Sequence, residues 1–142
     1  MRWSAAGAIR TSTIIDIART HNLRLPSYDP AELDKHIKVF DQLRDLYAVL
    51  EAFSIARNSI VSPRVVERIA LELFEDAARQ NIRIFEVRFS PDWAFSGHSL
   101  NWDDTLEALL RAKTHAESQY DMAVAYIAIT SRSLGPESCI KT

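Results

Sequence analysis

The feature that most constrains the fold is a strand, helix, strand pattern in the second half of the chain. Residues 82–89 alternate with period two and are rich in β-branched and aromatic side chains, which favours a strand that ends at Ser90-Pro91. Residues 122–130 form a nearly continuous apolar run, typical of a strand buried on both faces. The long connection between them predicts parallel pairing with a right-handed crossover, and therefore an α/β fold.

Helical patterns flank the first of these strands. Ser62-Pro63 is a strong helix start, because a hydroxyl cap precedes a proline at the first helical position, and apolar spacing continues to about Gln80. After the strand, residues 92–101 are expected to form a loop. Asn101 is then expected to cap a helix that runs to Tyr120.

The first half of the chain is predicted to hold three further helices and no complete strand. Thr11-Ser12-Thr13 supplies a hydroxyl N-cap for a helix that ends near His21-Asn22. Asp29-Pro30 begins a second short helix that runs through His36. Residues 41–58 carry apolar side chains roughly on one face and predict a third helix.

Composition narrows the class of protein. The 142 residues are 47% hydrophobic with a net charge of −2, which favours one ordinary globular domain and gives no sign of nucleic-acid binding. The longest apolar stretches fall well short of the roughly 20 residues that span a bilayer, so no membrane association is expected. The single Cys139 excludes an intramolecular disulfide and fits a cytoplasmic location.

Few side chains have the spacing of a catalytic or metal site. The four histidines form no local zinc pattern, and neither a serine-nucleophile elbow nor a glycine-rich phosphate loop is present. His98 retains some interest, because it follows the first strand, where active-site groups of α/β proteins are common. Glu86 and Arg88 share one side of that strand, either as an exposed ion pair or as groups that support a site.

Several segments in order resemble the adenosine deaminase family, from Gly7 to about Cys139. The first is Gly7-Ala8-Ile9-Arg10, which is similar to the end of the family motif His-x-His-x-Asp-Gly-x-x-Arg. The others resemble the family's first helix and loop, its next helix, its second strand and the exit of its third strand: residues 11–15, 22–26, 68–70, 75–79, 85–91 and 129–133.

The resemblance implies a metal-dependent (β/α)8 barrel that hydrolyses adenosine to inosine and ammonia, with zinc lowering the pKa of the attacking water. Such a barrel needs about 250 residues, so this chain would be the N-terminal part of a single barrel domain, with the first two to three strands, their helices and an inserted helical segment. Arg2, Ser4 and Ala6 stand where the family has two zinc histidines and an aspartate. Zinc is therefore a cofactor of the family that this chain is not expected to bind.

The same resemblance suggests where a purine nucleoside would contact this part of the family. Its candidate substrate-binding residues are Gly7, Leu46, Val49, Leu50, Phe53 and Arg88, with no catalytic or metal-binding residue in the chain. From spacing alone, the preferred interpretation of the helix that carries four of them is an ordinary amphipathic core helix. Two readings remain: a truncated deaminase that is inactive alone, or a non-catalytic binding module that keeps the partial scaffold.

Overall fold

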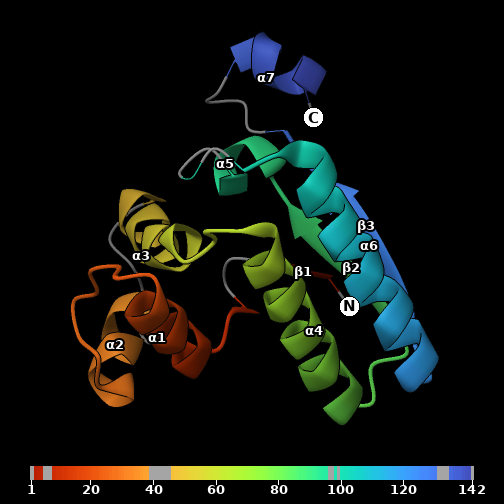
Figure 1. Cartoon of the computed structure of the whole chain (residues 1–142), viewed down its shortest axis with the longest axis horizontal. Helices are drawn as coiled ribbons and strands as arrows, with labels where there is room; N and C mark the ends of the chain where they lie inside the picture. The colour runs from red at the N-terminus through yellow and green to blue at the C-terminus, as the bar shows by residue number, and fades with distance from the viewer. Residues whose placement is uncertain are drawn as a thin grey trace.

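A three-stranded parallel sheet lies at the centre of the computed structural model, which describes residues 2–4, 8–38, 46–95, 98, 100–130 and 135–141 (Figure 1). The strand order is β1 (Arg2–Ser4), β2 (Ile84–Phe89) and β3 (Ala123–Ala128). The β2–β3 pair runs in continuous register along six residues of each strand. The predicted parallel pairing is therefore confirmed, and β1 adds the remnant of one more strand.

Local capping signals set the start of the long helices. The Ser62 hydroxyl accepts a hydrogen bond from the Val65 amide at 3.3 Å, and Asn101 accepts one from the Asp104 amide at 3.0 Å, as the sequence predicts. The helices are α1 (Thr11–Thr20), α2 (Pro30–Ile37), α3 (Leu46–Asn58), α4 (Pro63–Arg79), α5 (Pro91–Phe95), α6 (Trp102–Gln119) and α7 (Gly135–Lys141).

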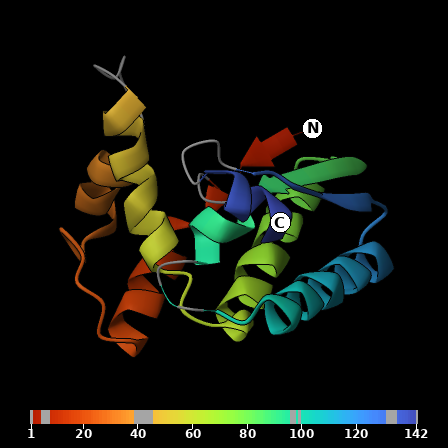
Figure 2. The ribbon, with the colours of Figure 1, turned by 90° about the horizontal axis from the view of Figure 1, so that it is seen from above.

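One face of the sheet is covered by α4 and α6, which pack against each other (Figure 2). Phe85 and Val87 of β2 and Val124 of β3 point into this layer and are at most 4% exposed. Phe74 of α4 is fully buried there, and its ring meets that of Phe85 edge to face at 6.1 Å between centroids. This layer is the main hydrophobic core.

The opposite face of the sheet is open in the part of the chain that the structure describes. Ile84 is 70% exposed, and Arg88, Ala123 and Ala125 on the same face are exposed as well. The apolar run at residues 122–130 predicted a strand buried on both faces, and this prediction is wrong for the described structure. The physical reason is that no described element packs on that face.

Helices α1, α2 and α3 form a separate group at one side of the sheet (Figure 1). Their contacts bury a second, smaller core made of Ile14, Ile15, Leu33 and Ala56. The predicted helix over residues 41–58 is observed from Leu46, and residues 41–45 lie outside the described structure.

Two local predictions need correction, and one helix was missed. The N-cap of α1 is Arg10 rather than a hydroxyl residue, because the Thr11 and Thr13 hydroxyls bond to Asp34 and Glu72 of other helices. The predicted loop over residues 92–101 begins with the short helix α5. Helix α7 was not predicted.

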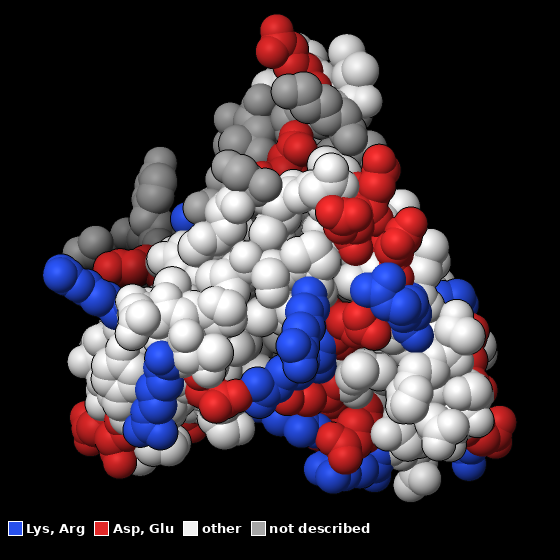
Figure 3. Space-filling view, viewed as in Figure 1, with Lys and Arg blue, Asp and Glu red and all other residues white. Residues whose placement is uncertain are grey.

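One face of the molecule carries charges of both signs. On the face seen in Figure 3, Lys and Arg side chains alternate with Asp and Glu, and the middle of the face is largely uncharged. This distribution does not resemble the single-sign stripe of a nucleic-acid-binding surface. Among the described residues, no helix is long and apolar enough to cross a membrane.

Candidate functional site

The carboxyl end of β2 is the candidate site, because catalytic groups of parallel α/β proteins gather where the strands end. Arg88 lies one residue before the end of β2, on the open face and exposed, where alternation predicted it. Ser90 follows the strand directly. Its hydroxyl oxygen is buried and has no hydrogen-bond partner among the described residues.

A hydrogen bond links the loop after β2 to α3. The Nε2 atom of His98 lies 2.9 Å from the carbonyl oxygen of Asn58, the last residue of α3, and accordingly donates to it. The residues joined are 40 positions apart in the sequence. The C-terminal end of α3 is therefore held beside the candidate site.

The candidate nucleoside contacts on α3 are only partly placed. Leu46, Val49 and Leu50 belong to the first turns of α3, and their side chains lie outside the described structure. Phe53 is half-buried. Gly7 also lies outside the described residues, and the proposed roles of these five positions and of Arg88 stay predictions.

Arg10 anchors the segment after β1 to the C-terminal half of α4. Its guanidinium donates to both carboxylate oxygens of Asp76, at 2.8 and 2.6 Å, and to Glu75 at 2.6 Å. The hydrogen bonds from Arg10 hold the pKa of Asp76 below its usual range, and the two carboxylates raise the pKa of Arg10. The last residue of the family-like motif is thus fixed by a forked ion pair.

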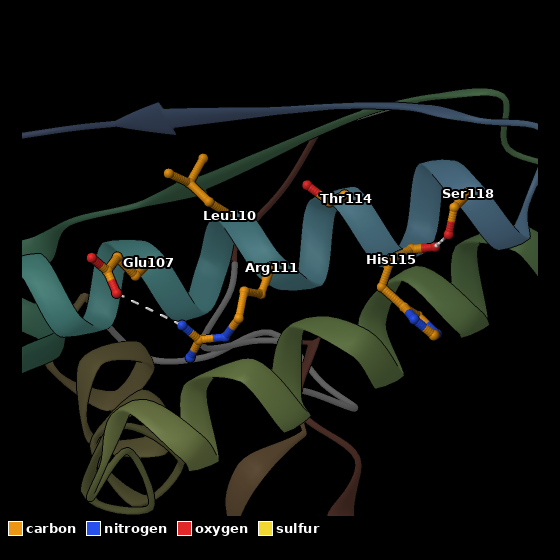
Figure 4. Close-up of a pocket in the computed structure, with 6 residues that line it drawn as sticks. All are labelled: Glu107, Leu110, Arg111, Thr114, His115 and Ser118. Atoms are coloured by element: carbon orange, nitrogen blue, oxygen red, sulfur yellow. Dashed lines mark hydrogen bonds and ion pairs between the residues drawn. The ribbon is translucent and has the colours of Figure 1, made fainter.

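An open hollow of about 560 Å³ lies on the outer surface of α6 and not at the carboxyl end of β2. It is lined by Glu107, Leu110, Arg111, Thr114, His115 and Ser118, all from one helix (Figure 4). Arg111 is bound to Glu67 at 2.8 Å and lies 3.8 Å from Glu107. The hollow lies on the helix layer and not at the carboxyl ends of the strands. Two of its charged side chains, Glu107 and Arg111, pair with each other.

The described residues do not fit a zinc ion. They contain no group of three or more His, Cys, Asp or Glu side chains arranged to hold a metal. A zinc site of the usual kind needs three or four such ligands. The expectation that the chain binds no zinc remains a prediction, because several residues lie outside the described ranges.

Solved structures define the fold class. An adenine deaminase from Arthrobacter aurescens superposes with a TM-score of 0.85 at 17% identity, covering 99% of this chain and 42% of that one. A zinc-containing amidohydrolase from Burkholderia ambifaria gives 0.80 at 21% identity, covering 97% and 36%. The ADAL protein of Arabidopsis, solved with GMP, gives 0.76 at 22%, covering 99% and 42%. The fold is therefore mixed α/β with parallel strands, and it matches part of deaminase and amidohydrolase structures.

Sequence comparison then identifies the family. The profile described as adenosine deaminase matches residues 4–142. Adenosine deaminases from Vibrio vulnificus (strain YJ016) and Clostridium botulinum (strain Loch Maree / Type A3) are each 35% identical, over 95% and 82% of this chain. The chain belongs to the adenosine deaminase family and corresponds to its N-terminal portion. It spans 34–40% of the length of these relatives.

The sequence pointed to part of this site. It placed Arg88 and His98 near the end of β2, but it gave no sign that His98 reaches α3. Ser90 was noted only as the end of the strand, although the Ser-Pro pair at 90–91 repeats the signal at 62–63 and marks the start of α5. The carboxylate partners of Arg10 were missed, because they lie more than 60 residues away.

Proposed function

We propose that residues 1–142 are the N-terminal part of one adenosine deaminase-like (β/α)8 barrel domain, and that the complete domain hydrolyses adenosine to inosine and ammonia. The family match over residues 4–142 carries this proposal. The order of strands and helices supports it, since β2, α6 and β3 repeat the strand and helix alternation of such a barrel. In this proposal the chain forms one side of the substrate-binding site of the complete domain.

The substrate proposed is adenosine or a related purine nucleoside. Gly7, Leu46, Val49, Leu50, Phe53 and Arg88 would contact it. Support comes from the position of Arg88 at the carboxyl end of β2 and from the bond between His98 and α3, which holds the helix with four of these residues beside that end. The neighbours solved with GMP and named for adenine are consistent with a purine.

Zinc chemistry is not assigned to this chain, because its described residues do not supply the ligands. Arg2 and Ser4 occupy the two histidine positions of the family motif, and Ala6 occupies the aspartate position. A guanidinium stays protonated and cannot ligate a metal, and alanine offers no carboxylate. The isolated chain is therefore expected neither to bind stoichiometric zinc nor to deaminate adenosine.

A second function remains, that of a binding module without catalysis, and the changed motif is the observation that favours it. A hybrid protein separates the two. Residues 1–142 would replace the N-terminal part of the Vibrio vulnificus deaminase that they match. The unchanged hybrid is expected to be inactive. The hybrid with Arg2→His, Ser4→His and Ala6→Asp is expected to bind zinc and to deaminate adenosine, measured by ultraviolet absorbance.

The result that would overturn the deaminase proposal is a restored hybrid that is folded and contains zinc but leaves adenosine intact. Circular dichroism and metal analysis on the same sample establish those two conditions. Turnover by the unchanged hybrid would instead show that the substituted motif still serves catalysis, against the prediction made from Arg2, Ser4 and Ala6.

A further inference from the structure

A small cavity lies inside the main hydrophobic core, between the sheet and the helices that cover it. Its volume is about 50 Å³. Its walls come from α4, β2, α5, α6 and β3, and from the segments just before α1 and α4. The residues that line it are buried, apart from Ile9, Phe89 and Tyr126, which are half-buried. The cavity is therefore nearly closed, and its least covered side lies at these three side chains.

The cavity offers little to a polar molecule. Among the described residues that line it, every side chain is apolar except that of Tyr126. The Tyr126 hydroxyl already donates to the carbonyl of Leu109 at 2.8 Å, and burial raises the pKa of this phenol, so it stays neutral. A buried water needs two to four polar partners. Water is therefore a poor occupant of this space, although a water molecule is small enough to enter it.

Two alanines in the walls leave the space unfilled. Ala70 of α4 is 4% exposed and Ala94 of α5 is 7% exposed, so neither is at the surface. Because their side chains end at Cβ, the larger neighbours on the other walls meet no atoms across the gap. Side chains such as Ile69 of α4 and Val87 of β2 lose dispersion contacts on that side. An apolar molecule in the cavity would restore those contacts.

We propose that this cavity is a binding site for one small apolar solute, about the size of a xenon atom or a two-carbon hydrocarbon. A dry apolar cavity of about 150 Å³ accepts benzene or xenon. The present cavity is roughly a third as large, so it excludes an aromatic ring. The inference does not rest on the proposed function, because the cavity lies on the covered face of the sheet and Arg88 lies on the open face.

Xenon dissolved under pressure is the probe, and methyl NMR spectra of the chain are the measurement. The methyl signals of Ile69, Leu73 and Leu109, which line the cavity, are expected to shift and to reach a plateau as the xenon concentration rises. Ile14 and Leu33 of the second, smaller core report any general effect of the gas, and no plateau is expected there. The same response in both cores, or no plateau at the cavity methyls, would overturn the proposal.

Two substitutions that fill the cavity locate the site. Ala70→Val is expected to weaken xenon binding at least roughly tenfold, because its added methyl groups take the space of the solute. Val66→Ile adds one methylene to the same wall, and is expected to weaken binding roughly threefold. Ala78→Val is the matched control, since Ala78 lies on the same helix but outside the cavity, and it is expected to leave binding unchanged.

Circular dichroism establishes which of these variants is folded, and Val66→Ile decides alone if Ala70→Val does not fold. Xenon binding of unchanged affinity in the folded filling variants would place the solute elsewhere and overturn the site. Benzene tests the size limit. It is expected to cause no saturable shift at Ile69 or Leu73, and saturation by benzene at these methyls would overturn the assignment to a solute of xenon size.

Discussion

The two faces of the central sheet differ although the same strands form both. On the covered face, Phe85 and Val87 alternate with the residues of the open face and are at most 3% exposed. On the open face, Ile84 is 70% exposed, and Arg88 shares its side. Parallel sheets are almost always covered on both faces. The difference therefore marks the open face as a surface that other strands would cover in the barrel proposed above.

The largest expected effect is a difference in the free energy of unfolding between alanine substitutions at two neighbouring residues on opposite faces of β2. Phe85→Ala removes a buried ring that packs on Phe74, and is expected to lower the free energy of unfolding by about 3–5 kcal/mol. Ile84→Ala is the control, expected to cost less than about 1 kcal/mol because that side chain is already mostly in water. Urea denaturation of both variants measures the difference. Equal losses would mean that the two faces are equally buried in solution.

A smaller effect is expected where α4, which covers the sheet, is tied to the segment after β1. Arg10→Ala removes the forked ion pair to Asp76 and the bond to Glu75, and is expected to destabilise the chain by about 2 kcal/mol. Arg10→Lys is expected to recover only part of this loss, since an ammonium cannot form the fork. Arg64→Ala, on the exposed side of α4, serves as the control. A loss no larger than that of the control would contradict the anchoring role.

The smallest effect concerns acid pH and the same anchor. Hydrogen bonds from Arg10 lower the pKa of Asp76 in the folded chain, so the stabilisation is fully present above the unfolded value of about 4 and is lost as the pH falls below it. Asp76→Asn is expected to be less stable than the unchanged chain at pH 7, with a smaller difference near pH 2. Urea midpoints at the two pH values measure this, and a difference that grows in acid would contradict it.

Local signals made much of the fold predictable. Ser62 and Asn101 cap their helices through hydrogen bonds to residues three positions away. The local sequence alone therefore predicts where these helices begin. The N-terminus of α1 was predicted less well, because Thr11 and Thr13 bond to residues 23 and 59 positions away. The open face was not predictable either. The apolar run at residues 122–130 shows that the strand can be buried on both faces, but it does not show which segment would cover each face.

The candidate site divides in the same way. Strand alternation predicted that Arg88 and Glu86 share one side of β2, and the family resemblance rested in part on the segment that ends at Arg10. The bond between His98 and Asn58 depends on tertiary packing between separate elements. So do the hydrogen bonds that join Lys113 and Glu117 to the backbone of Val124. No spacing in the sequence encodes them.

The central claim, that one face of this sheet is covered and the other open, is tested most directly by thiol labelling in a Cys139→Ser background. Ala125→Cys places a thiol on the open face, and Val87→Cys places one on the covered face. The account predicts that the thiol at position 125 reacts at nearly the rate of a free thiol, and that the thiol at position 87 reacts at least roughly a hundredfold more slowly, because it must wait for local opening. Equal rates at the two positions in the folded chain would contradict the account.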